Sequence, residues 1–400
     1  MSVKPNPVAV YDQPHQFEPL LPTSASEDLA LKAGLVVEAS LRLQGAVNAD
    51  VRHELQRLVR AMNSYYSNRI EGQSTHPVNI DRALRKDFSE RPDVARLQRI
   101  AVAHIDAEEQ IEKRATDDTF ALSSACLVQA HTSLYERLDV DDRMTEDGRA
   151  VEPGALRQSD VTVHRHHPPA WRAVPSFLAR ADQVYARPWS LERLLIATAC
   201  AHHRLVWVHP FLDGNGRASR LQMHAALHRL TGGLWSVNRG LARRREEYYL
   251  RLAEADMPRH GDLDGRGNLS ERMLKAWCEF FLDVCLDQVT FMTRCLDLDT
   301  LKQRVATLVR GRSDKGSAYR DEAILPLRHV LLAGPVSRAE FIRMTGLGER
   351  SGRTILSRLV KDGLLQSDTP KGEVRIGFPL DALATLFPNL YPEAASTTLD

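Results

Sequence analysis

The sequence predicts a mainly α-helical protein. Apolar residues recur at the three- to four-residue spacing of a helix over long segments, most clearly over 194–207 and 217–230. Strand-like patterns are short and lie around 161–163 and in the pair 363–366 and 374–377. Glycines and prolines separate the helical segments, as expected at helix ends.

The composition indicates a globular protein of two or three domains. The 400 residues are 43% hydrophobic, and 53 Lys and Arg nearly balance 52 Asp and Glu, so a net charge of +1 gives no basic footprint for nucleic acid over the whole chain. No apolar run approaches the roughly 20 residues that span a bilayer, and the N-terminus lacks the apolar core of a signal peptide. Five cysteines without a Cys-x-x-Cys pair are typical of buried thiols in a reducing compartment. We therefore expect a cytoplasmic protein without membrane contact.

The N-terminal third is expected to be an extended arm followed by helices. Five prolines make residues 1–22 incompatible with a helix. Helices then fill residues 23–117, and the first begins at Ser24 or Ser26, either of which can cap it. The other helices of this region are expected over about 49–70, ending at Gly72, and within 77–116, where the last spans 94–113.

Residues 118–310 are expected to form the core of the protein. One long stretch within it, 140–170, is poor in helix signal. The expected helices are 119–138, 194–207, 217–230, 269–292 and 301–309, the last capped by Asp299 or Thr300. A polar, glycine-containing segment at 311–316 is the expected linker to the rest of the chain.

The chemistry is concentrated in twelve residues, His209-Pro-Phe-Leu-Asp-Gly-Asn-Gly-Arg-Ala-Ser-Arg220. Pro210 ends the preceding helix, and Gly214-Asn215-Gly216 forms a turn that opens the next one. Backbone N–H groups at a helix N-terminus bind anions, because the macrodipole is positive there. Arg217 and Arg220 project from one face of the first turn. The segment therefore predicts a polyphosphate site.

Two other side chains of this segment suit nucleotide chemistry. Asp213 offers a hard oxygen ligand for the Mg²⁺ that would accompany a nucleotide. His209 has an ordinary pKa near neutrality and lies beside it as a general base. Phe211 is expected to anchor the loop in the core. Each residue type alone is a weak signal, since a lone His-Pro is usually a turn and helix arginines usually pair with nearby acids. Their conjunction favours function.

The twelve residues resemble the motif of the Fic family, H-P-F-x-[D/E]-G-N-G-R-x-x-R, at every defined position. The resemblance implies an all-helical Fic core with a short β-hairpin flap. It also implies transfer of AMP from ATP to a Ser, Thr or Tyr hydroxyl of a target protein, or of the chain itself.

The resemblance assigns roles within the segment. His209 would deprotonate the hydroxyl, and Asp213 would hold Mg²⁺. The backbone of 214–216 and the Asn215 side chain would stabilise phosphate charge. Arg217 would hold the β-phosphate side and Arg220 the γ-phosphate. Family members that phosphorylate their target have an altered loop at this place. The intact Gly-Asn-Gly of this sequence therefore argues against phosphate transfer.

An inhibitory element is expected at the end of the second helix. Ser67, Glu71 and Gly72 fit the motif [S/T]-x-x-x-E-[G/N] of inhibited Fic proteins, and Ser67 and Glu71 share one helix face. A carboxylate in the last turn of a helix opposes the macrodipole, and an arginine would relieve it. The resemblance implies that Glu71 pairs with Arg220 and misdirects the α-phosphate of ATP.

The flap is expected before the Pro-Pro pair at 168–169, with 161–163 as its strand. Val163 and His164 would contact the nucleotide, and the strand edge would clamp a target segment by β-augmentation. His164, His166 and His167 lack regular ligand spacing, so a polar flap tip is favoured over a metal site.

Four aromatic residues near the motif have open roles. The resemblance suggests that Tyr248 or Tyr249 lines an adenine pocket, while core packing explains either tyrosine equally well. His202 and His203 are expected to lie at the surface or at the edge of the core.

Residues 318–385 are expected to form a separate module that resembles a winged helix-turn-helix. Its helices are expected over 323–332, 338–344 and 350–362, followed by the hairpin 363–377, and a tail, 386–400, is expected to be disordered from Pro392. The basic residues of the third helix are suited to meet DNA; they are Arg350, Arg353, Arg358 and Lys361. The module carries only a small basic excess, so docking of a protein or of a second copy as a homodimer stays open.

The expected function is therefore protein adenylyltransferase activity with ATP and Mg²⁺. The alternative from another class is a DNA-binding regulator whose core acts as a nucleotide sensor. Transfer of another nucleotide or of phosphocholine also stays open, as does removal of AMP with the help of Glu71.

Overall fold

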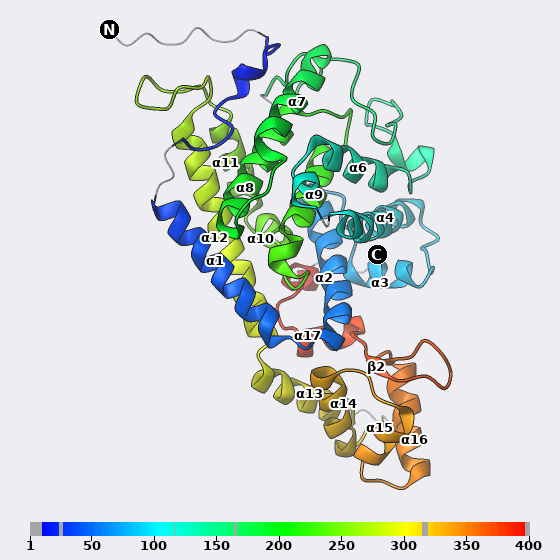
Figure 1. The fold of residues 1–400 in the computed structure, drawn as a ribbon. Helices are drawn as coiled ribbons and strands as arrows, with labels where there is room; N and C mark the ends of the chain where they lie inside the picture. The colour runs from blue at the N-terminus through cyan, green and yellow to red at the C-terminus, as the bar shows by residue number, and fades with distance from the viewer. Residues whose placement is uncertain (1–9, 24–26, 116, 164–165, 314–318, 397–400) are drawn as a thin grey trace.

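The computed structural model describes residues 10–23, 27–115, 117–163, 166–313 and 319–396. Figure 1 shows an elongated helical molecule with one large body and a smaller part, residues 298–376, at one end. The prediction of a mainly α-helical protein is confirmed, because helices carry nearly all the regular structure in the described residues. None of the helices in these ranges combines the length and apolar character that a membrane crossing requires.

The elements follow one another along the chain as listed here. The α-helices are α1 (Glu27–Ala46), α2 (Ala49–Ile70), α3 (Pro77–Leu84), α4 (Pro92–Arg114), α5 (Asp118–Ala121), α6 (Ser124–Tyr135), α7 (Val174–Tyr185), α8 (Leu191–Val208), α9 (Asn215–Thr231), α10 (Asn238–Arg243), α11 (Arg245–Ala255), α12 (Glu271–Cys295), α13 (Leu298–Ser313), α14 (Ile324–Ala333), α15 (Arg338–Met344), α16 (Glu349–Lys361) and α17 (Leu380–Leu386). The 3-10 helices are η1 (Pro14–Phe17), η2 (Val140–Arg143), η3 (Trp171–Ala173), η4 (Asp321–Ala323) and η5 (Pro392–Ser396). Strands β1 (Leu365–Gln366) and β2 (Arg375–Ile376) pair antiparallel.

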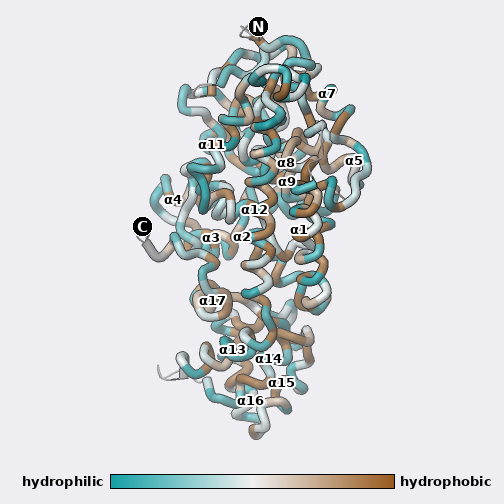
Figure 2. Tube along the Cα trace, turned by 90° about the vertical axis from the view of Figure 1, so that its left-hand side faces the viewer, coloured by the Kyte–Doolittle hydropathy of each residue, from teal (hydrophilic) through white to brown (hydrophobic). Residues whose placement is uncertain are grey.

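The body is built around α8, α9 and α12. Helix α1 packs along α12 and α8, while α2, α4 and α6 cover α9. Figure 2 shows α12 running along the length of the body, with apolar and polar segments alternating along it. Trp277 of α12 is fully buried and donates its ring N–H to the Ala199 carbonyl of α8 at 2.7 Å. All five cysteines are buried and free. Helix α9, which carries the motif, is therefore enclosed on several sides.

Two helix starts differ from the prediction. The segment 119–138 contains two helices, because the Ser123 side chain accepts the N–H of Cys126 and begins α6 there. Helix α13 begins earlier than predicted, and the carboxylate of Asp297 accepts the N–H of Thr300 at 2.9 Å. Asp297 thus does the capping predicted for Asp299 or Thr300.

Two other predictions lie outside the described residues, wholly or in part. The candidate caps of α1, Ser24 and Ser26, belong to the segment that is not described. The predicted linker 311–316 is described only as far as 313, and these first residues continue α13.

The N-terminal arm packs on the body over its described part. Phe17 is fully buried and meets Phe177 edge to face, with the ring centroids 5.0 Å apart. Buried Arg204 of α8 donates to the Pro19 carbonyl at 3.0 Å. Apart from η1, the described residues 10–22 of the arm are not helical, as the prolines predict.

The C-terminal part has the predicted order of three helices, α14 to α16, and a hairpin, β1–β2. Ser337 caps α15 by accepting the N–H of Glu340 at 3.2 Å, so the helix begins at residue 338 as predicted. This part contacts α2 directly, since Arg375 of β2 donates to Glu54 at 2.8 Å. The helix that carries Glu71 is thus in contact with the C-terminal part at its other end.

The prediction of disorder from Pro392 is wrong for residues 392–396. Tyr66 of α2 donates its hydroxyl proton to the Leu390 carbonyl at 2.9 Å and to Glu393 at 2.7 Å. The Tyr391 ring stacks on Tyr66, with centroids 6.2 Å apart. The aromatic residues of α2 therefore order the described part of the tail, an effect that the composition of the tail does not reveal.

Candidate active site

The loop between α8 and α9 contains two residues with positive φ angles, a conformation that is incompatible with an α-helix. His209, the C-cap of α8, lies in the left-handed region with φ of 49°, and Pro210 follows it. Gly214, the N-cap of α9, has φ of 76°, and a Cβ there would lie 2.4 Å from the Tyr135 ring. Both the conformation and the space require glycine at 214.

Asn215 and Arg157 fasten this loop. The Asn215 side chain accepts the N–H of Phe211 at 2.9 Å and donates to the Phe211 carbonyl at 3.0 Å. Arg157 donates from Nε to the His209 carbonyl at 2.8 Å, and its backbone N–H donates to the Pro210 carbonyl at 2.9 Å. The Asn215 amide therefore holds the loop from within, which differs from the predicted contact of this side chain with phosphate.

Asp213 is held by two rings of α6. The Tyr135 hydroxyl donates to Asp213 Oδ2 at 3.1 Å, and His131 Nε2 lies 3.1 Å from the Asp213 carbonyl. The His131 ring also stacks on Phe211, with centroids 3.9 Å apart. Phe211 is fully buried, as expected of a core anchor. The Asp213 side chain remains 48% exposed, which leaves room for a cation beside it.

The N–H groups at the start of α9 and the Arg217 guanidinium make the N-terminus of this helix electrostatically positive. The first helical hydrogen bond of α9 runs from Ala218 N–H to the Gly214 carbonyl, so the N–H groups of 215–217 have no helical acceptor. Arg217 is 5% exposed; it donates to the Tyr135 hydroxyl at 2.9 Å and lies 3.7 Å from Asp213 Oδ2. Such a helix end favours an anion.

His209 is a neutral base in this setting. Burial, together with the electrostatic effects of His166 and Arg157, lowers the pKa of His209 to about 4. The negative charges of Asp213 and Glu71 raise it, but their effect is smaller. The imidazole therefore stays unprotonated, and able to accept a proton, across the physiological pH range.

Glu71 reaches the site from the end of α2. Arg220 donates from Nη2 to Glu71 Oε1 at 2.6 Å and to the Ser67 carbonyl at 3.0 Å, and from Nε to Ser67 Oγ at 3.0 Å. Arg220 is fully buried. A Cβ on Gly216 would lie 2.3 Å from Glu71 Oε1, so the glycine makes room for the carboxylate. Gly72, with φ of 74°, then turns the chain away from α2.

The tyrosine pair of α11 lies next to this contact. Tyr248 is buried, and its hydroxyl lies 2.8 Å from His202 Nε2, which fits the core-packing interpretation. Tyr249 is 42% exposed and donates its hydroxyl proton to the Ile70 carbonyl at 3.1 Å. His202 and His203 are both buried, so the prediction that they lie at the surface or core edge is wrong.

The predicted flap is described only in part. Val163 and His166 exchange backbone hydrogen bonds of 3.0 and 2.8 Å, an isolated bridge, where the pattern predicts a strand. His164 lies outside the described residues. His166 Nε2 lies 2.7 Å from the Trp207 carbonyl, so this histidine fixes the base of the flap to the end of α8.

Three residues that hold the site are not part of any predicted motif. They are His131, Tyr135 and Arg157. Each lies more than fifty residues before the side chain or carbonyl that it contacts, and sequence pattern gives no local signal for such pairs. The one indication in the sequence is that Arg157 lies in the stretch 140–170, which is poor in helix signal.

The fold and this loop define a class of site, in which a neutral histidine and a half-exposed carboxylate precede the N-terminus of a buried helix. Residues 121–227 match the model of the Fic/DOC family, and this range includes the whole loop from His209 to Arg220. The chain therefore contains a Fic/DOC-family domain.

Similar proteins carry the same family name. The chain is 28% identical over 202 residues, 50% of its length, to a protein adenylyltransferase Fic of Nematostella vectensis, and 33% identical over 137 residues, 33% of its length, to the protein of that name in Drosophila erecta. The matches cover 43% and 27% of those proteins, so the chain spans less than half of their length. A solved Fic family protein from Desulfovibrio desulfuricans G20 has a similar fold, with a TM-score of 0.52 at 19% identity over 89% of this chain and 98% of the other.

Proposed function

We propose that this protein transfers AMP from ATP to a Ser, Thr or Tyr hydroxyl of a target protein. The observation that carries the proposal is the loop His209–Arg220, which joins a neutral base, a carboxylate and a free helix N-terminus. The relatives named adenylyltransferases support the choice of AMP.

In the proposed reaction, His209 takes the proton of the target hydroxyl. The hydroxyl oxygen bonds to the α-phosphorus of ATP, and the bond from that phosphorus to the pyrophosphate oxygen breaks. The N–H groups at the start of α9 and the Arg217 guanidinium stabilise the negative charge of the phosphates. Asp213 would hold Mg²⁺, and its half-exposed carboxylate fits this hard cation. Bound there, Mg²⁺ would neutralise charge on the pyrophosphate.

We also propose that the described conformation is inhibited. Ser67 and Glu71 occupy the Arg220 guanidinium, which would otherwise bind the γ-phosphate. A carboxylate in that place repels the γ-phosphate and turns the α-phosphate away from in-line attack. Target segments would enter beside the flap and pair with its backbone by β-augmentation.

The experiment that tests the proposed transfer follows the label of ATP. The protein is incubated with Mg²⁺, cell lysate and ATP labelled on either the α- or the γ-phosphate. We expect label on protein from the α position only, because pyrophosphate leaves with the γ-phosphate. Label from the γ position would identify phosphate transfer, and label from neither would direct attention to other nucleotides or to phosphocholine.

The dependence on pH should reflect the low pKa of His209. With a pKa of about 4, the base form persists down to about pH 5, so the labelling rate should change less than about twofold between pH 7.5 and 5.5. An imidazole with the ordinary pKa near 6.5 would lose about tenfold at pH 5.5. The measurement is kcat/KM against pH in Glu71→Gly at saturating Mg²⁺. A tenfold fall by pH 5.5 would contradict the assignment of a buried, neutral base.

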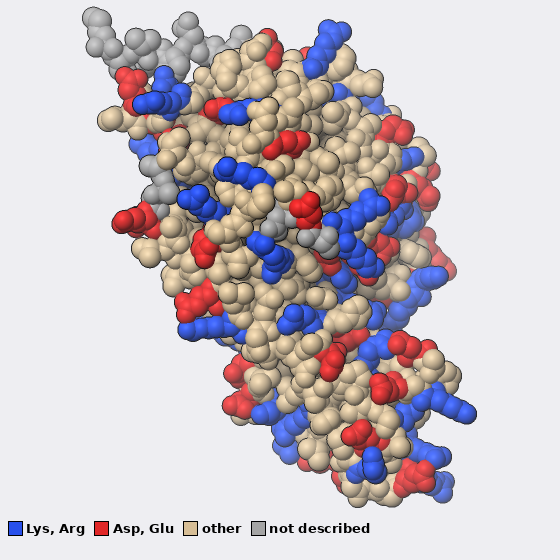
Figure 3. Space-filling view, viewed as in Figure 1, with Lys and Arg blue, Asp and Glu red and all other residues tan. Residues whose placement is uncertain are grey.

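A second proposed function, DNA binding, rests on the outer face of α16. Arg350, Arg353 and Lys361 are exposed on this helix at the far end of the molecule, where Figure 3 shows basic and acidic side chains intermixed. Two of its arginines have acidic partners, since Arg353 pairs with Glu349 and Arg358 with Asp362. The position of α16 resembles that of a recognition helix, but the acidic partners of its arginines reduce the positive charge of its outer face.

DNA binding through α16 should weaken steeply with salt, and Arg353→Ala should reduce the salt slope by about one unit. Fluorescence anisotropy with duplex fragments at several salt concentrations measures both effects. Arg310→Ala, at another exposed and ion-paired arginine, is the matched control. A flat salt response would favour docking of a protein on this face.

A further inference from the structure

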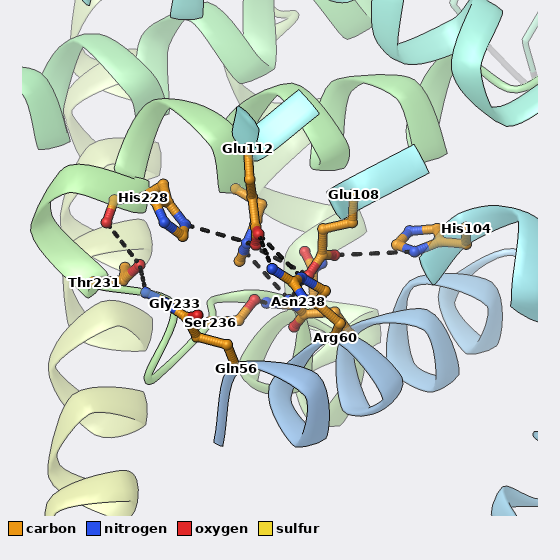
Figure 4. Close-up of polar contacts among 12 residues, drawn as sticks. Gln56, Arg60, His104, Glu108, Glu112, His228, Thr231, Gly233, Ser236 and Asn238 are labelled. Carbon is orange, nitrogen blue, oxygen red and sulfur yellow. Dashed lines mark hydrogen bonds and ion pairs between the residues drawn. The ribbon is translucent and has the colours of Figure 1, made fainter. Parts of the chain in front are cut away.

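A buried polar cluster lies between α4 and α9, away from the catalytic loop. Glu108 and Glu112 are one turn apart on α4, and His224 and His228 are one turn apart on α9. Figure 4 shows Glu108, Glu112 and His228 converging from the two helices. The side chains of Glu108, Glu112 and His224 are at most 5% exposed, while His228 is 28% exposed and borders the solvent.

Three donor atoms of this cluster are close enough to share one ion. Glu112 Oε1 lies 2.8 Å from His224 Nε2 and 3.6 Å from His228 Nδ1. All three atoms lie within 4.8 Å of one another. Ligand atoms around a tetrahedral Zn²⁺ are separated by about 3.4 Å, which follows from metal–ligand bonds of about 2.0–2.1 Å. Small side-chain shifts therefore suffice to bring the three atoms around a metal ion.

Several buried atoms of the cluster have no hydrogen-bond partner among the described residues. His228 Nδ1 is one, although it faces Glu112. Glu108 Oε2 is another, on a side chain with no exposed surface. Buried polar atoms without partners are costly, and a bound ion is one of the groups that satisfy them. Of the two, only His228 Nδ1 belongs to the three donor atoms, while Glu108 Oε2 lies 4.0 Å from His104 Nδ1.

A second layer of side chains orients the donors. Arg60 of α2 donates from Nε at 3.0 Å and from Nη2 at 2.6 Å, both to Glu112 Oε2, which leaves Oε1 toward the imidazoles. Asn63 donates to Glu108 Oε1 at 2.9 Å, and its Nδ2 lies 3.3 Å from His224 Nδ1. Outer contacts of this kind fix the ring and carboxylate orientation in metal sites.

We propose that Glu112, His224 and His228 bind a divalent transition-metal ion, with Zn²⁺ as the best fit. Two imidazoles and a carboxylate form a donor set typical of zinc in proteins. Glu108, whose Oε1 lies 3.4 Å from His224 Nε2, is a candidate fourth ligand. The partly exposed His228 gives the ion a path from solvent.

Without a metal ion, a proton on His224 would pair this imidazole with the carboxylates of Glu108 and Glu112. Burial opposes a charge on His224, but the carboxylates of Glu108 and Glu112 outweigh it and raise the pKa of His224. A divalent ion would replace this proton and bring His228 into the network. The choice between an ion-pair network and a metal site is therefore an outcome of the test.

The proposed ion would join the helices beneath the inhibitory contact. On α9, His224 follows Arg220 by one turn, and on α2, Asn63 precedes Ser67 by one turn. The same seam of α2, α4 and α9 thus contains the Arg220–Glu71 contact and the proposed metal site. The ion would fix α4 to α9 independently of ATP, which makes its role structural.

The test uses the full-length, tag-free protein without nucleotide. After treatment with a chelator and dialysis, the protein is titrated with Zn²⁺ by calorimetry, and bound metal is counted by mass spectrometry. We expect one ion per chain and a Tm that rises with Zn²⁺. His228→Ala removes a ligand at the border of the cluster and should weaken binding by more than the roughly 10- to 100-fold that outer-layer changes cost.

Two controls separate this site from other binding. Asp213→Ala, in the catalytic loop, should keep the ion, and His53→Ala, at an exposed histidine of α2, should bind like wild type. Wild type that binds no Zn²⁺ would overturn the proposal in favour of the ion-pair network. Equal binding by His228→Ala and wild type would also overturn it, since the ion would then sit elsewhere. Circular dichroism checks that the variants are folded.

Discussion

Glu71→Gly is expected to raise AMP labelling from α-labelled ATP on the order of 100-fold. The change frees the buried Arg220 guanidinium, which Glu71 Oε1 contacts at 2.6 Å, so that the γ-phosphate can bind there. The factor is the loss that a misplaced reacting group typically causes in an enzyme. Labelling of lysate proteins and of the chain itself, measured as an initial rate, gives the comparison with wild type.

Two matched variants separate removal of the carboxylate from damage to α2. Glu71→Gln keeps the length and helix preference of the side chain but removes its charge, so we expect an intermediate rise. Ser67→Ala removes the hydroxyl that accepts from Arg220 Nε and keeps Glu71, so we expect a smaller rise. Unchanged labelling in a folded Glu71→Gly protein would refute the proposed inhibition, while the proposed transfer would still be open to test.

His209→Ala in the Glu71→Gly background is expected to lower the labelling rate by a factor of about 10² to 10⁴. General-base catalysis contributes rate factors of this size. Among the described residues, the nearby His166 is not free to replace His209, because its imidazole is engaged with the Trp207 carbonyl. The measurement is the initial rate of transfer from α-labelled ATP in the double variant.

Binding of ATP should persist in this double variant, and that result distinguishes a base from a structural residue. The loop is held through the His209 carbonyl, which accepts from Arg157, and through Asn215 with Phe211. None of these contacts uses the imidazole. Labelling that survives in the double variant would assign the base to another group, and loss of both binding and labelling would indicate a collapsed loop.

Local pattern predicted most helices of this protein, because their causes are local. Apolar spacing, prolines and capping residues lie within a few residues of the elements they determine, as at Pro210, Gly214 and Ser337. Predictions failed where a distant partner decided the outcome. Residues 392–396 are ordered by Tyr66 of α2, and His202 is buried against Tyr248.

The sequence by itself determined the helical class and the order of residues in the loop His209–Arg220, including the glycine that its N-cap requires. Only the tertiary structure decided which side chains meet. Glu71 and Arg220 are 149 residues apart and touch because α2 packs beside α9. Asn215 faces the loop because the folded backbone of Phe211 offers it both a donor and an acceptor. Glu112, His224 and His228 converge because α4 lies against α9. Helix periodicity fixes which residues share a face, but the packing of one face against another is set by the whole core.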